Sequence, residues 1–356
     1  MNDMRKSRLH ALFFGFLLAV CLSCLVLDAF GVNQGIRTVR AIIVADQNFA
    51  RQTNWERKAR EVIEPADSNI TAILGIHLEI AGYRLWRHPD ETDLFRMAEM
   101  MIDSVGRDSA DVLIGFTLSA RPPKTQKVRT DGVTVPLAGT MIRVYQGTSD
   151  QNMFAPYVLL HELGHLMGAV HVNSRTLMSP IYNRLVSIDL DPLNQQILRI
   201  TRGIDFARGF GSLSHSQLET LSGLYEQAVN GGNHETVTLM QLTDMYAALG
   251  DYIRAADACR RMAAYDPRSG AVWDKSGEIY ALNGRADSAI SLLEGAVGEV
   301  DDQGVVFRRL AMLQYALGDS AAARTNAALA AKFGFPVDST HRKNLSRDTV
   351  PPSDNK

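Results

Sequence analysis

HELGHLMGAVH, residues 161–171, fills every fixed position of the pattern H-E-x-x-H-x-x-G-x-x-H. His161 and His165 are four residues apart, so a helix places both on one face. Gly168 can end that helix, because a left-handed backbone costs glycine nothing, and the turn would bring His171 back toward the pair. Three histidine ligands leave one position of a tetrahedral zinc ion open to water, as in catalytic zinc sites. The stretch therefore predicts a zinc ion (Zn2+) held by His161, His165 and His171.

Glu162 follows the first histidine directly. At this position its carboxylate can reach a zinc-bound water and take its proton as general base. The pattern H-E-x-x-H alone also occurs by chance on solvated helices, but the extension through Gly168 and His171 favours a metal site over that reading. We therefore predict that Glu162 is the catalytic residue.

A second motif follows at residues 176–182, which read TLMSPIY. With both motifs in place, the chain resembles the metzincin zinc peptidases, and most closely their matrixin branch. The resemblance implies that Met178 forms a tight turn beneath the metal. It also implies that Pro180 and Tyr182 line the pocket for the substrate residue just past the scissile bond. Without the zinc motif, Met178 would read as an ordinary core methionine.

The fold class that follows is an α+β, metzincin-like catalytic domain over residues 36–211, with a twisted mixed sheet and an active-site helix. Its sequence favours strands and helices in alternation. The predicted strands are 36–45, 77–86 and 110–118, and the predicted helices are 55–63, ended or kinked by Pro65, and 93–105.

Residues 133–145 form a weaker strand candidate that Pro136 interrupts. A proline in this place favours an edge strand or a bulge. An extended peptide can add to such an edge by backbone hydrogen bonds, so Leu137, Ala138 and Gly139 are predicted substrate contacts. An ordinary solvent-facing edge is the alternative.

The last third of the chain repeats with a period of 34 residues. The repeat is seen in Gly250, Gly284 and Gly318, and in alanines five residues after each glycine. Small residues at this period predict three tetratricopeptide (TPR) repeats over residues 236–337, joined to the catalytic domain by a helix and linker at 212–235. Such an array offers a concave surface for a protein or peptide partner, and a spacer or an oligomerisation block is the alternative.

The first 31 residues carry basic side chains followed by the apolar run 11–27. This pattern predicts a signal peptide or an N-terminal membrane anchor, so the rest of the chain would be exported, and it would contact the membrane if uncleaved. Lipidation at Cys24 is a weaker alternative. The polar tail at 338–356 is predicted to be disordered.

Composition excludes several other classes. The 356 residues are 46% hydrophobic and 21% charged, which is typical of a globular protein. A net charge of −2 offers no reason to expect nucleic acid as a partner. Three cysteines, two of them in the N-terminal apolar run, provide no disulfide framework.

Three functions remain open from the sequence. The favoured one is an exported zinc endopeptidase that hydrolyses peptide bonds by a zinc-bound water activated by Glu162, with a repeat module for protein binding. The alternative is an envelope scaffold or adaptor that acts through the repeats and carries a vestigial zinc domain. A third is hydrolysis of a non-protein amide.

Overall fold

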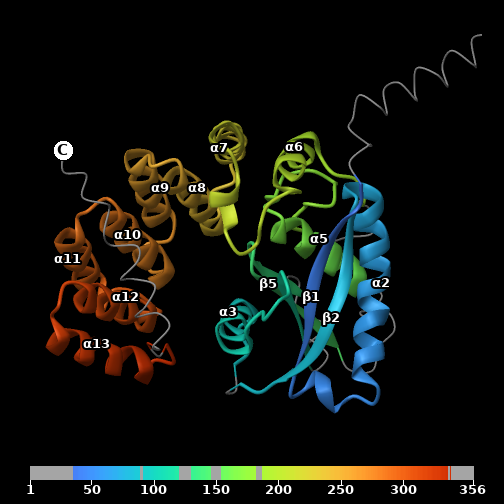
Figure 1. Cartoon of the computed structure of the whole chain (residues 1–356), viewed down its shortest axis with the longest axis horizontal. Coiled ribbons are helices and arrows are strands. Elements are labelled where there is room, and N and C mark those ends of the chain that lie inside the picture. Colours follow the sequence, from blue (N-terminus) through green and yellow to red (C-terminus); the bar gives the residue numbers. More distant parts are fainter. Residues whose placement is uncertain are drawn as a thin grey trace, which may run out of the picture.

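The computed structural model describes residues 35–88, 91–119, 130–145, 154–181, 187–335 and 337. A sheet with flanking helices is followed by an array of helix pairs (Figure 1). The predicted export segment 1–31, the tail 338–356 and Tyr182 lie outside the described residues. Within the described part of the chain, no helix is both long enough and apolar enough to cross a membrane.

The sheet has five strands in the order β2-β1-β3-β5-β4. Four strands are parallel: β1 (Arg37–Asp46), β2 (Ile76–Trp86), β3 (Val112–Ser119) and β5 (Gly139–Tyr145). The edge strand β4 (Gly132–Val135) is antiparallel to β5. The mixed sheet predicted from the sequence is thereby confirmed.

Helices cover both faces of the sheet. α2 (Trp55–Leu74) and α5 (Ala155–Leu166) share one apolar core with the sheet, whereas α3 (Leu94–Val105) packs against the opposite face. Alternate residues of β1 therefore enter different cores: Ile43 packs on the side of α2, and Val44 on the side of α3. Because both faces are covered, the central strands are runs of buried apolar residues. A short 3-10 helix, η1 (Phe49–Arg51), follows β1.

Two local predictions were wrong in part. Pro65 does not end a helix, because α2 continues through it to Leu74. Pro65 lies on the exposed side, so the backbone group it leaves unpaired faces solvent, while the buried stripe continues on the other side through Ala66 and Ile70. Residues 133–145 are two strands rather than one interrupted strand, and Pro136 lies in the turn between β4 and β5.

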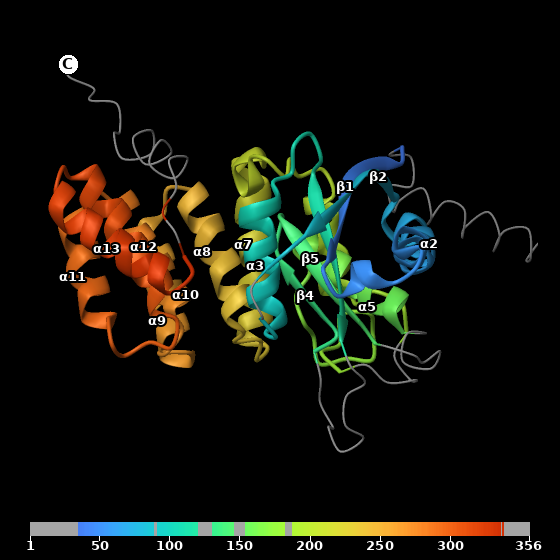
Figure 2. The same ribbon diagram turned by 90° about the horizontal axis from the view of Figure 1, so that it is seen from below.

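Three elements connect the sheet to the repeats. α6 (Pro192–Thr201) begins at an Asp191 cap, η2 (Gly209–Ser212) follows, and α7 (His215–Asn230) begins with a capping box formed by Ser214 and Gln217. Seen from below, α7 and α3 lie between the sheet and the repeat helices (Figure 2). The division into domains at 36–211, 212–235 and 236–337 stays a prediction.

The C-terminal region is TPR-like. Its three helix pairs are α8 (Thr236–Ala248) with α9 (Tyr252–Tyr265), α10 (Gly270–Leu282) with α11 (Ala286–Ala296), and α12 (Gln303–Ala316) with α13 (Ser320–Lys332). The turn within each pair contains Gly250, Gly284 or Gly318, all with positive φ, which explains why glycine recurs there. The alanines that recur with them are fully buried where the helices meet. These pairs confirm the repeat prediction.

Candidate metal centre

Three histidine side chains converge on one point. His161 and His165 extend from the same face of α5, and the chain turns at Gly168, where φ is 93°, to bring His171 to them. The Nε2 atom of His165 is 2.9 Å from that of His161 and 3.0 Å from that of His171, and the Nε2 atoms of His161 and His171 are 3.1 Å apart. The three predicted ligands therefore form one cluster.

The second ring nitrogen of each histidine, Nδ1, lies against an oxygen atom. These oxygens are the backbone carbonyls of Leu177 (2.7 Å from His161) and Ala169 (2.8 Å from His165), and Oε1 of Glu235 (2.6 Å from His171). A carbonyl or carboxylate only accepts, so each Nδ1 carries a proton, and in a neutral ring the Nε2 atom then keeps its lone pair. Histidines that bind metals are held in the same way by partners on their second nitrogen.

The cluster fits a zinc ion. Three lone pairs at about 3 Å would repel one another without a cation between them, and nitrogens sharing a tetrahedral zinc lie about 3.3 Å apart. Burial lowers the pKa of His161 well below its ordinary value and lowers that of His165 to about 3, so both rings are neutral. Neutral imidazole is the form that binds metal.

Glu162 lies beside the cluster with its carboxylate held in place. Its Oε2 accepts a hydrogen bond of 2.7 Å from the hydroxyl of Thr134 on β4. Burial, opposed by this hydrogen bond, raises the pKa of Glu162 to about 7. A side chain at Gly132 would collide with Glu162 at 2.7 Å, so the glycine lets β4 approach α5 closely. A buried carboxyl with a pKa near neutrality is suited to exchanging protons.

Met178 lies beneath α5 in the turn Thr176–Ser179, where the Ser179 amide donates to the Thr176 carbonyl at 3.0 Å. The methionine is fully buried, and a side chain at Gly164 would meet its sulfur at 2.7 Å. The same turn supplies the Leu177 carbonyl to His161, and the Met178 carbonyl accepts from the amide of Val172. The turn thus supports two of the three histidines.

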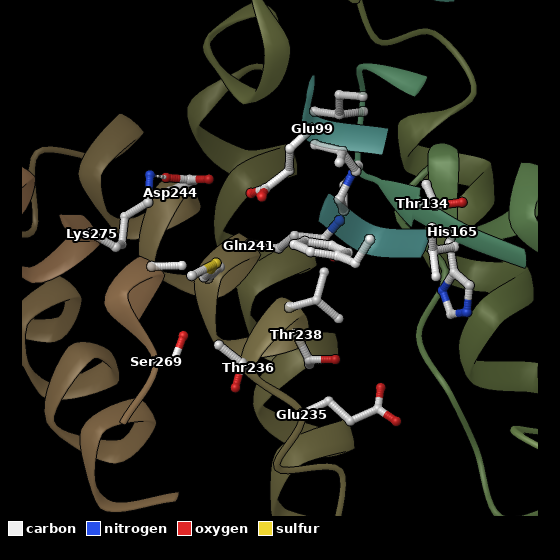
Figure 3. Close-up of a pocket in the computed structure, with 18 of the residues that line it drawn as sticks. Glu99, Thr134, His165, Glu235, Thr236, Thr238, Gln241, Asp244, Ser269 and Lys275 are labelled. Atoms are coloured by element: carbon white, nitrogen blue, oxygen red, sulfur yellow. Dashed lines mark hydrogen bonds and ion pairs between the residues drawn. The ribbon is translucent and has the colours of Figure 1, made fainter. Parts of the chain in front are cut away.

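A cleft of about 1470 Å³ opens at this cluster. The three histidines, Glu162 and strand β4 line it together with helices of the repeats. Figure 3 shows His165 and Thr134 on one side of it and Asp244 and Lys275 of the repeats on the other. Leu137 and Pro180, both predicted substrate contacts, line it, whereas Tyr182 lies outside the described residues.

Ala138 and Gly139 are not part of an open edge. The Ala138 carbonyl accepts from Leu113, and Gly139 lies in β5 between β3 and β4. The edge strand is β4, because the chain reverses at Pro136 and places β5 inside the sheet. The backbone that an extended peptide can reach is therefore that of residues 132–135.

Sequence reasoning missed four residues that shape the site. Two come from the segment before the first repeat: Glu235 contacts His171, and Asn233 donates to the His171 carbonyl at 2.9 Å. The Tyr225 hydroxyl on α7 donates to the Gly168 carbonyl at the turn between His165 and His171. Thr134 is the fourth. None lies in a motif, and Glu235 is 64 residues from its partner, so no local pattern pointed to them.

No protein-family model matches the chain, and no curated protein matches it at a significant level. Solved structures do match. TTC0263, a thermophilic TPR protein of Thermus thermophilus, is 21% identical with a TM-score of 0.31, over 44% of this chain and 88% of that one. MamA MSR-1 is 16% identical with a TM-score of 0.30, over 52% of this chain and 91% of that one. The TPR-like fold of the C-terminal region rests on its own helix pairs and their period.

Proposed function

We propose that this protein is a zinc-dependent, metzincin-like endopeptidase with a TPR-like module for binding protein. One observation carries the proposal: the Nε2 atoms of three histidines converge within 3.1 Å of one another beside a buried glutamate. The turn at Met178 and the open edge of β4 support it, since a peptidase needs a rigid ligand set and a place for an extended chain. The predicted N-terminal export segment leads us to propose that it acts outside the cytoplasm.

In the proposed reaction, the metal ion and the residues of the site have separate roles. A bound zinc ion would supply Lewis acidity, which lowers the pKa of water toward about 7 and polarises the substrate carbonyl. Glu162 accepts a proton from the attacking water, whose oxygen bonds to the carbonyl carbon. The same carboxyl then gives this proton to the amine nitrogen as the C–N bond breaks. Thr134 keeps the carboxylate turned toward the site, and β4 pairs with the substrate backbone.

The test is hydrolysis of a peptide library by the full chain and its Glu162→Gln variant. The variant should retain zinc and lose turnover by about 10²- to 10⁴-fold, because the amide cannot take a proton. The same change at Glu64, an exposed residue of α2, is the matched control and should leave turnover unchanged. Hydrolysis that persists in Glu162→Gln, or after a chelator removes the metal, would rule the proposal out.

A scaffold that acts through its repeats is the second candidate, favoured by the TPR-like helix pairs themselves. It differs from the first in its metal content. Purified protein with negligible zinc and no hydrolysis, yet with retained binding of a protein partner, would favour the scaffold.

A further inference from the structure

The cleft between the sheet and the repeats is strongly acidic. Ten carboxylate side chains line it against three basic ones, although the whole chain has 39 acidic and 37 basic residues. The excess is therefore local. Glu162 and Glu235 lie beside the histidines, and Glu99, Asp244 and Asp266 are among the other carboxylates that line the cleft.

The basic residues of the cleft cancel only part of this charge. Arg96 lies 3.4 Å from Glu91 and 3.7 Å from Asp302. Lys275 is bound between Asp244 at 2.8 Å and Glu278 at 3.1 Å. By contrast, Glu99 and Asp266 have no ion pair with another described residue, and both are only partly exposed. Carboxylates that line a concave surface focus a negative potential into it.

The wall of the cleft also holds two buried polar groups that lack a partner. Thr238 and Gln241 lie on α8 and are 1% and 5% exposed. One end of the Gln241 amide contacts the Tyr225 hydroxyl at 2.5 Å, but its Nε2 and the Thr238 Oγ1 have no hydrogen-bond partner among the described residues. Both side chains lie in the wall opposite His165 (Figure 3). A peptide backbone offers both N–H and C=O groups to such atoms.

We propose that this cleft selects extended polypeptide segments rich in lysine and arginine, with their backbone along β4 and α8 and their cationic side chains against the acidic wall. The inference rests on the proposed function, because it names the substrate class of the same site. It follows from three independent features: the local excess of carboxylates, the unpartnered polar groups on α8, and the open strand edge beside Glu162. The same acidic wall repels negatively charged side chains, so acidic segments are poor substrates.

The experiment uses three fluorescent peptides of equal length with one uncharged core and flanks of lysine, glutamine or glutamate. Binding to the full-length Glu162→Gln protein is measured by anisotropy at pH 8 after chelation, so that neither metal nor turnover contributes. The lysine peptide should bind about tenfold more tightly than the glutamine peptide, and its advantage should shrink in high salt. The glutamate peptide should bind most weakly.

Two variants test whether the carboxylates of the cleft cause the preference for the lysine peptide. The double variant Glu99→Gln and Asp266→Asn removes two carboxylates from the cleft and should reduce the preference for lysine. Glu294→Gln removes an exposed carboxylate of α11 outside the cleft and should leave the preference unchanged. Equal affinity for the three peptides, or an equal loss of preference in Glu294→Gln, overturns the inference.

The outcome also separates this inference from the proposed function. Wild-type protein that cleaves all three peptides with equal kcat/KM remains a peptidase, but the inferred substrate class is wrong. Protein that cleaves none of them yet binds the lysine peptide preferentially retains the acidic cleft as a binding site, and the proposed hydrolysis fails.

Discussion

The first and third repeats share one sequence pattern but meet the sheet domain in different ways. Leu242 of the first repeat belongs to the same apolar core as α5 and the sheet. Leu310, the equivalent residue of the third repeat, lies in a separate core with α11 and α13. The third repeat touches α3 through polar groups instead: Arg308 approaches Asp103 at 3.5 Å, and Arg96 approaches Asp302 at 3.7 Å.

The first repeat is therefore attached firmly to the sheet domain, whereas the third repeat is attached by weaker contacts. The first repeat is held by buried apolar surface, and the segment that leads into it supplies Glu235 to His171. The contacts at the third repeat are partly exposed ion pairs, which contribute only about 0–1 kcal/mol each. One end of the array is therefore joined to the histidine cluster, and the other makes only weak contacts with α3.

The largest effect is expected from removing the equivalent leucines. Leu242→Ala and Leu310→Ala should each lower the free energy of unfolding by about 2–5 kcal/mol, because both side chains are buried and each deletion leaves a cavity. Hydrogen exchange distinguishes the two. Exchange should rise in α5 and α8 with Leu242→Ala, but only in α10 to α13 with Leu310→Ala. Faster exchange in α5 with both variants would contradict the separation of the two cores.

Glu235→Gln should weaken zinc binding by about 10- to 100-fold, because an uncharged amide orients His171 less firmly than the carboxylate does. Competition with a chromophoric chelator measures the affinity. Asp302→Asn is the matched control, since Asp302 precedes α12 as Glu235 precedes α8, and its zinc affinity should not change. Urea unfolding of metal-free protein should be nearly the same in both variants. An unaltered zinc affinity in Glu235→Gln would show that Glu235 does not contribute to zinc binding.

A smaller effect concerns Glu99, a residue of α3 that lies near Arg308 of the third repeat. Burial, opposed by nearby Arg308, raises the pKa of Glu99 to about 7. The folded state therefore holds a proton that the unfolded chain releases at lower pH, and stability falls as the pH rises from about 4.5 to 7. Glu99→Gln should stabilise the protein by about 1 kcal/mol at pH 8 and hardly at all at pH 4.5. Melting temperatures at both values check this, and an equal gain at both would contradict it.

The success of the sequence-based predictions depended on the distance between interacting residues. His161 and His165 are adjacent on a helix, and the repeats recur at a fixed period, so local spacing was sufficient to find both. The hairpin at Pro136 was missed because a proline in a turn and a proline in an edge strand cannot be distinguished from the sequence alone. The end of the helix at Pro65 was predicted wrongly for a related reason. Whether a proline ends a helix depends on whether it lies on the solvent-facing side of that helix, which the sequence alone did not show.

The residues of the motif were enough to predict the histidine cluster, since four-residue spacing and a glycine turn bring the three histidines together whatever surrounds them. The orientation of those histidines was not predictable in this way. It depends on Leu177, Ala169 and Glu235, and Glu235 reaches His171 only because α7 and the first repeat share a core with the sheet. The charge of the cleft has the same origin, because carboxylates scattered along the chain face one another only after the repeats fold against α3 and β4.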